Sequence, residues 1–65
     1  MDASRASASF GAWVKERRRG AGLTQGELAR RVGIAEVTLR KIEADERRPS
    51  PPVAALLAEQ LALEP

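Results

Sequence analysis

Residues 36–44 combine acidic, apolar and basic side chains in a pattern that could contact a large anionic partner. Placed on a helix at about 100° per residue, they divide into two sides. Leu39 and Ile42 lie together on the inner side. The outward side consists of Glu36, Val37, Arg40, Lys41 and Ala44. A carboxylate can accept and an amine can donate hydrogen bonds at base edges, and a small apolar side chain fits a thymine methyl group. A base-reading face and a merely solvated face both remain open on this pattern.

The composition removes most other kinds of chemistry. The 65 residues contain neither cysteine nor histidine, which excludes disulfides, thiolate metal sites and the usual general base. We therefore expect no metal, no cofactor and no small-molecule ligand. The serines fall near the N-terminus or at an expected helix cap, and no nucleophile–base pair is evident. These features predict that the chain is not an enzyme.

Length and hydropathy predict one small domain. A chain of 65 residues has room for a single domain. Residues 1–8 are expected to form a flexible tail, because Met1 is their only larger apolar side chain, and residues 9–65 form the domain. No apolar run approaches the roughly 18 residues of a membrane span, and no secretory signal is present. We therefore expect a cytoplasmic protein without membrane contact.

Helical periodicity predicts four helices and no strand. They span residues 10–20, 24–32, 35–44 and 51–62. The second helix has the clearest start, because Thr24 and Glu27 have the spacing of a capping box. Gly33 suits its left-handed end, whereas Gly26 in its first turn costs about 1 kcal/mol relative to alanine. Ser50 is expected to cap the fourth helix.

The apolar positions of these helices define an expected core. Its members are Trp13, Val14, Leu28, Val32, Ile34, Leu39, Ile42, Val53, Leu56, Leu57 and Leu61. Filling this core leaves no long apolar seam at the surface. The isolated chain is therefore expected to be monomeric or only weakly dimeric.

The second and third helices, joined by a short turn at Gly33, have the helix-turn-helix pattern, which an ordinary helical hairpin shares. Four stretches are more specific. They are Leu-Thr-Gln-Gly-Glu-Leu-Ala at 23–29, Val-Gly-Ile at 32–34, Leu-Arg-Lys-Ile-Glu at 39–43 and Arg-Arg-Pro-Ser at 47–50. With these, the chain from about Phe10 to Leu63 resembles the Xre, Cro and phage-repressor family of helix-turn-helix domains. It resembles in particular the N-terminal domain of a larger bacterial transcriptional regulator.

This resemblance implies an all-α, compact, lambda-repressor-like bundle of four helices, or of five in the full-length protein. It also implies sequence-specific binding of double-stranded DNA in transcription regulation, with a recognition helix at about 35–44 in the major groove. Glu36, Val37 and Lys41 would then meet bases, and Gln25 and Arg40 would anchor phosphates. The full set of implied DNA-binding residues is Thr24, Gln25, Glu36, Val37, Arg40 and Lys41. Such regulators commonly bind as homodimers, here through regions outside this chain.

The resemblance further implies an ion pair inside the domain, because matching positions pair across the bundle. Arg18 lies on the inner half of the first helix, and Glu43 flanks the inner side of the third. We expect them to form a partly shielded and bidentate salt bridge. The alternative is that both groups are solvated on separate faces.

Two features depart from the family pattern. Asn or Gly usually follows the recognition helix, whereas Asp45 and Glu46 stand in this region and are expected to repel phosphate. Glu36 stands where a neutral side chain is common, and its carboxylate could serve only the helix N-terminus. Together with Val37, the acidic pair supports an alternative function, in which the fold is a protein-docking module within a larger multidomain regulator.

Overall fold

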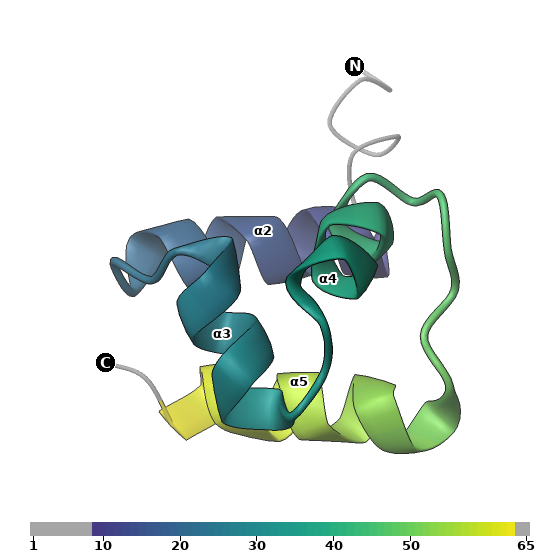
Figure 1. Ribbon diagram of the computed structural model, residues 1–65. Helices are drawn as coiled ribbons and strands as arrows, with labels where there is room; N and C mark the ends of the chain where they lie inside the picture. Colours follow the sequence, from purple (N-terminus) through teal and green to yellow (C-terminus); the bar gives the residue numbers. More distant parts are fainter. Residues whose placement is uncertain (1–8, 64–65) are drawn as a thin grey trace.

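The structure, a computed structural model, describes residues 9–63, which form four helices and no strand (Figure 1). The helices are α2 (Phe10–Gly20), α3 (Gln25–Val32), α4 (Glu36–Glu43) and α5 (Pro51–Leu63). Each expected range is correct to within one residue at either end, and the all-α fold is confirmed. The flexible tail expected for residues 1–8 lies outside the described residues. Within 9–63, no helix combines the length and the apolar composition that a bilayer crossing requires.

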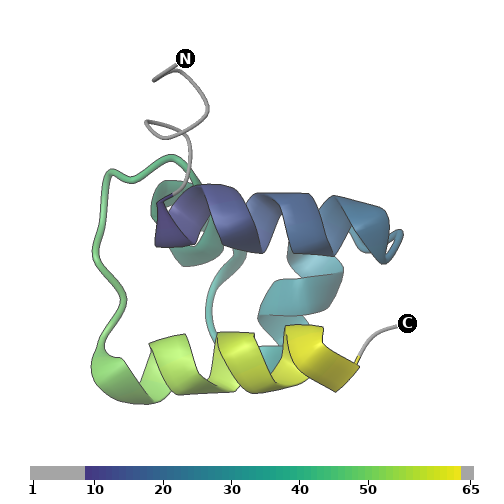
Figure 2. The same ribbon diagram turned by 180° about the vertical axis from the view of Figure 1, so that it is seen from behind.

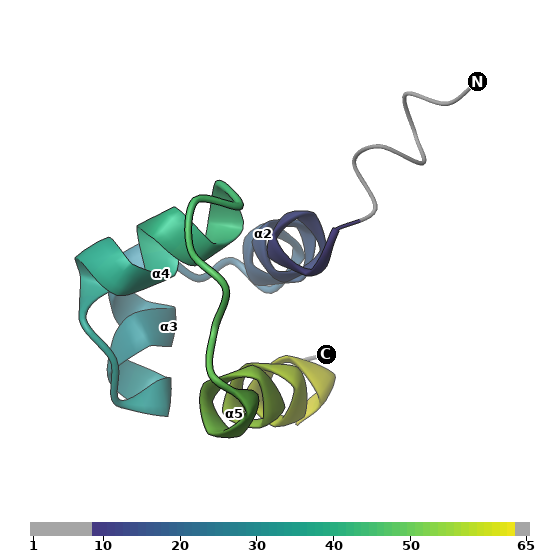
Figure 3. The same cartoon turned by 90° about the vertical axis from the view of Figure 1, so that its right-hand side faces the viewer.

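The helices form two layers that enclose the core. α2 and α5 make up one layer, and α3 and α4 make up the other (Figures 2 and 3). α2 contacts α4 and α5, and α3 contacts the same two helices. α4 is therefore held between α2 and α3, and its position depends on both.

Local hydrogen bonds define the two ends of α3. The Thr24 hydroxyl accepts from the Glu27 amide at 3.0 Å, and the Glu27 carboxylate accepts from the Thr24 amide at 2.8 Å. These two bonds complete the capping box that the sequence predicts. At the other end, Gly33 has a φ of 77°, the left-handed conformation that ends α3 and starts the turn. Ala35 gives α4 no side-chain cap, so packing must hold the start of that helix.

The core lies where the two layers meet. Its buried apolar residues are Val14, Leu23, Leu28, Ala29, Val32, Leu39, Ile42, Leu57 and Leu61. Ile34 and Val53 pack against this cluster and are partly buried. Two expected core residues are wrong, because Trp13 is 40% exposed and Leu56 is 44% exposed.

Both errors have the same physical cause. Trp13 precedes Val14 and Leu56 precedes Leu57, and the second residue of each pair is completely buried. Neighbouring helix residues point about 100° apart, and in these two pairs the second residue faces the core while the first faces away from it. Trp13 stacks instead on Phe10, with ring centroids 5.8 Å apart. Apolar surface therefore remains on α2 at Trp13 and on α5 at Leu56.

Replacing Leu39 by alanine tests the packing beneath α4. Leu39 is completely buried, so Leu39→Ala should lower the free energy of unfolding by about 2–5 kcal/mol. Leu63→Ala is the matched control, because Leu63 is 76% exposed and its loss should cost less than about 0.5 kcal/mol. Urea unfolding followed by circular dichroism measures both. A Leu39→Ala protein with the wild-type urea midpoint would contradict the core assignment.

Candidate nucleic-acid interface

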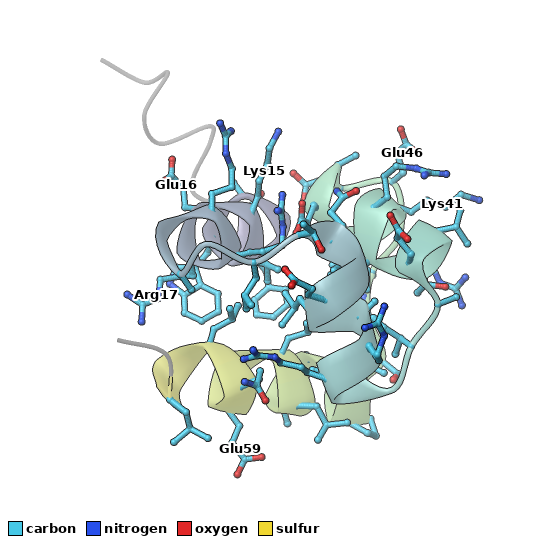
Figure 4. All side chains as sticks on the ribbon, turned by 60° about the vertical axis from the view of Figure 1, so that its left-hand side comes forward. Lys15, Glu16, Arg17, Lys41, Glu46 and Glu59 are labelled. Atoms are coloured by element: carbon cyan, nitrogen blue, oxygen red, sulfur yellow. The ribbon has the colours of Figure 1, made fainter. Side chains whose placement is uncertain are left out.

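The outward side of α4 is open to solvent along its length. Its exposed residues are Glu36, Val37, Arg40 and Lys41, and exposed Ala44 directly follows the helix as its C-cap. Leu39 and Ile42, on the opposite side, are at most 1% exposed and fix the helix to the core. Figure 4 shows Lys41 directed away from the bundle. One helix face therefore presents an anion, an apolar group and cations together, and an α-helix has the dimensions that the DNA major groove admits.

The carboxylate of Glu36 lies over the first turn of α3. A Cβ placed on Gly26 would come within 3.2 Å of Glu36 Oε1, so the carboxylate lies beside the space that a side chain at Gly26 would occupy. The start of α4 therefore approaches the start of α3 through the Glu36 side chain, at a position where α3 has no side chain. No sequence spacing rule relates these two residues, and the sequence reasoning did not foresee their contact.

Arg18, Glu43 and Gln25 form a hydrogen-bonded cluster at the junction of three helices. Arg18 donates from Nε to Glu43 Oε2 at 2.7 Å and from Nη2 to Glu43 Oε1 at 3.1 Å. Gln25 donates from Nε2 to the same Oε1 at 3.0 Å. Arg18 also donates from Nη1 to the Leu23 carbonyl at 2.8 Å. The Arg18–Glu43–Gln25 cluster therefore joins α2 to the start of α3 and the end of α4.

The cluster is largely shielded from water. The Glu43 side chain is 2% exposed and the Arg18 side chain is 11% exposed, so the two expected partners are paired and not solvated apart. A buried carboxylate is costly to desolvate and is tolerated only when donors surround it. Within the described residues, every buried side-chain nitrogen or oxygen has a hydrogen-bond partner. Removing Arg18 or Gln25 would therefore take hydrogen-bond donors away from the buried Glu43 carboxylate.

Thr24 and Gln25 are the expected DNA-binding residues at the start of α3. They differ in exposure and in the hydrogen bonds that their side chains already make. Thr24 is exposed, and its hydroxyl oxygen already serves the capping box. Gln25 is half-buried, and its amide is held by Glu43. The sequence reasoning assigned Gln25 only to phosphate and missed this bond, because the two residues are 18 positions apart and on different helices.

Asp45 has a structural partner that the sequence reasoning did not anticipate. Its φ of 62° is the left-handed conformation that favours Gly or Asn, the residues usual at this turn. Ser9 donates from Oγ to Asp45 Oδ2 at 2.8 Å and accepts from the Ala12 amide at 3.0 Å. Asp45 thus places its charge at the start of α2, where a helix favours an anion. Gly11 permits this approach, because a Cβ there would collide with the Ile42 carbonyl.

α2 also carries exposed basic side chains. Lys15 and Arg17 are both exposed, and Figure 4 shows them on different sides of α2. Arg17 is tied to α5, because its Nη2 donates to the Leu61 carbonyl at 3.1 Å. Within residues 9–63, no comparable hydrogen bond ties Arg40 or Lys41, the cations on the outward side of α4, to α2 or α5.

Comparison with known families agrees with this geometry. A family model described as helix-turn-helix matches residues 14–65, which include α3, the turn and α4. The chain belongs to this family, the Xre and lambda-repressor type of helix-turn-helix domain, whose members are DNA-binding domains found generally in transcription regulators. It is a regulatory and not an enzyme family. No curated protein and no solved structure gives a significant match to the chain.

The Arg18–Glu43–Gln25 cluster predicts a large effect of a single substitution. Arg18→Met leaves Glu43 buried without its cation and should lower the free energy of unfolding by about 3–5 kcal/mol. A chain of this length has a total stability of about 3–10 kcal/mol, so the loss should be plain in urea unfolding. Arg19→Met at the exposed neighbouring position is the control and should change little. Wild-type stability of Arg18→Met would contradict the role of the cluster.

Glu27 predicts a pH dependence of the capping box. Its pKa lies below the ordinary 4.5, first because the Thr24 amide donates to its carboxylate and then because of the Thr24 side chain. The stabilisation is therefore complete above pH 4.5 and is lost as the pH falls through the lowered pKa. Glu27→Gln keeps an acceptor but cannot titrate. The difference in Tm between wild type and Glu27→Gln should shrink when the pH is lowered from about 6 to about 3. An unchanged difference would argue against this titration.

Proposed function

We propose that the domain binds double-stranded DNA sequence-specifically, as the DNA-binding domain of a transcriptional regulator. In this proposal α4 lies in the major groove and the start of α3 faces the phosphate backbone. The observation that carries it is the division of α4 into a buried side that fixes the helix and an exposed side with acceptor, apolar and cationic groups. A face that served solubility alone has no need of Val37, which is 44% exposed.

Three residues on α4 have side chains suited to base edges. Glu36 only accepts hydrogen bonds, so it can use the N4 amino group of cytosine and is repelled by the acceptors of guanine. Val37 has no polar atom and suits a thymine methyl group. Lys41, about one turn further, can donate to O6 and N7 of guanine. All three are exposed, so each can reach a partner without unfolding the domain.

The start of α3 supplies phosphate contacts in this proposal. Amides at a helix N-terminus carry a partial positive charge that favours an anion. Thr24 lies there in solvent, and Gln25 is held in place by Glu43, which leaves its carbonyl oxygen and a second amide hydrogen for a partner. Arg40, exposed on α4, supplies a cation for the backbone.

The proposal extends to the setting of the domain. We place it in a bacterial, cytoplasmic regulator that binds DNA as a homodimer through regions outside this chain, without metal, cofactor or membrane. A second candidate is a protein-docking module, which exposed Val37 and the apolar surface around Trp13 favour. Salt separates the two, because phosphate neutralisation makes DNA affinity fall steeply with ionic strength.

Selection from a random duplex library tests the assigned roles. Glu36→Gln adds a donor to the acceptor, so it should change preference at one base pair by about 1–3 kcal/mol while Tm barely moves. Lys41→Ala should change preference at a neighbouring base pair. Gln25→Ala should weaken binding to all duplexes about equally, because phosphates carry no sequence information. Circular dichroism confirms that each variant is folded before selection.

Three outcomes would count against the proposal. An equal loss on all sequences for all three variants would mean that α4 reads nothing. An unchanged preference for Glu36→Gln, with stability lower by a few tenths of a kcal/mol, would mean that Glu36 only serves the helix N-terminus. Duplex binding that is absent, or that does not depend on salt, would favour the docking module.

A further inference from the structure

Gly26 is the glycine whose missing side chain faces the outward side of α4. A Cβ at this position would lie 3.2 Å from Oε1 and 3.5 Å from Cδ of Glu36. The first separation is shorter than ordinary van der Waals contact, so an added methyl group would have to displace the carboxylate. Glycine leaves free the space beside the Glu36 carboxylate that a side chain at position 26 would take.

The backbone itself does not require glycine at this position. The positive-φ glycines are Gly22 and Gly33, and Gly26 is not among them. It lies inside the first turn of α3, where glycine is less favourable than alanine. A residue with an unfavourable helix propensity and an ordinary backbone conformation is best explained by the space that it leaves free.

We propose that Gly26 is a positioning residue that determines how Glu36 presents its carboxylate to a base. The inference rests on the proposed function, in which Glu36 reads a base pair from the major groove. Discrimination between base edges depends on where the acceptor atoms are held. The space beside Gly26 admits a position of the carboxylate over α3 that a larger side chain would close, so the residue at position 26 affects where the acceptor lies.

A double-mutant cycle on thermal stability tests the contact without DNA. In a Glu36→Ala background, Gly26→Ala should raise Tm by about 4–8 °C, the usual gain for alanine over glycine in a helix of a small domain. With Glu36 present, the same change should raise Tm by less than half as much, because the methyl group must displace the carboxylate. Equal rises in the two backgrounds would overturn the proposed contact.

Gly20→Ala is the matched control for this cycle. Gly20 is also a helix residue, and a Cβ there meets nothing within 4 Å. Its effect on Tm should be the same in both backgrounds. Because no variant in the cycle removes a buried group, loss of the fold does not complicate the comparison.

Selection from the random duplex library tests the effect on specificity. Gly26→Ala should reduce preference at the base pair that Glu36→Gln changes, by about threefold or more, and leave the pair assigned to Lys41 unaltered. Gly20→Ala should alter neither. If Glu36→Gln changes preference and Gly26→Ala does not, the positioning role is wrong and the proposed function stands. If neither changes preference while duplexes still bind, base reading by Glu36 and its positioning by Gly26 both fail.

Discussion

A single buried carboxylate holds the helix-turn-helix to the rest of the domain. Glu43 ends α4, and its two oxygens take two hydrogen bonds from Arg18 on α2 and one from Gln25 on α3. Arg18 also bonds the Leu23 carbonyl in the turn that leads into α3. Because the charge is out of water, any rotation of α4 that broke these bonds would leave it uncompensated. The relative orientation of the three helices therefore depends on this cluster.

The same helix is held at its other end and at the turn that follows it. The Glu36 carboxylate lies beside the space left free at Gly26, and Asp45 accepts a hydrogen bond from the Ser9 hydroxyl at the start of α2. The contacts at Gly26 and Gly11 both depend on the absence of a side chain. α4 is thus restrained along its length while its outward side stays bare. Such restraint suits recognition of base edges, where small displacements of a polar group change the partner that it can reach.

Local rules predicted the helices well, and contacts between helices only partly. The capping box of Thr24 and Glu27 follows from a fixed spacing and a fixed geometry, so the sequence alone predicts it. Trp13 illustrates the limit, because two neighbouring apolar residues competed for one place in the core and periodicity could not choose between them. The hydrogen bond from Gln25 to Glu43 links α3 to α4, and Gly26 on α3 lies beside Glu36 on α4. Such contacts depend on how the helices cross, which only the folded structure defines.

In the proposed complex, DNA contacts the outward side of α4 and the start of α3. Titration of the isotope-labelled domain with a selected duplex, followed by NMR of the backbone amides, tests it most directly. We expect the largest shifts in residues 24–27 and 36–41, and small shifts around Trp13 on α2. Largest shifts on α2 and α5, with those of α4 unchanged, would contradict it.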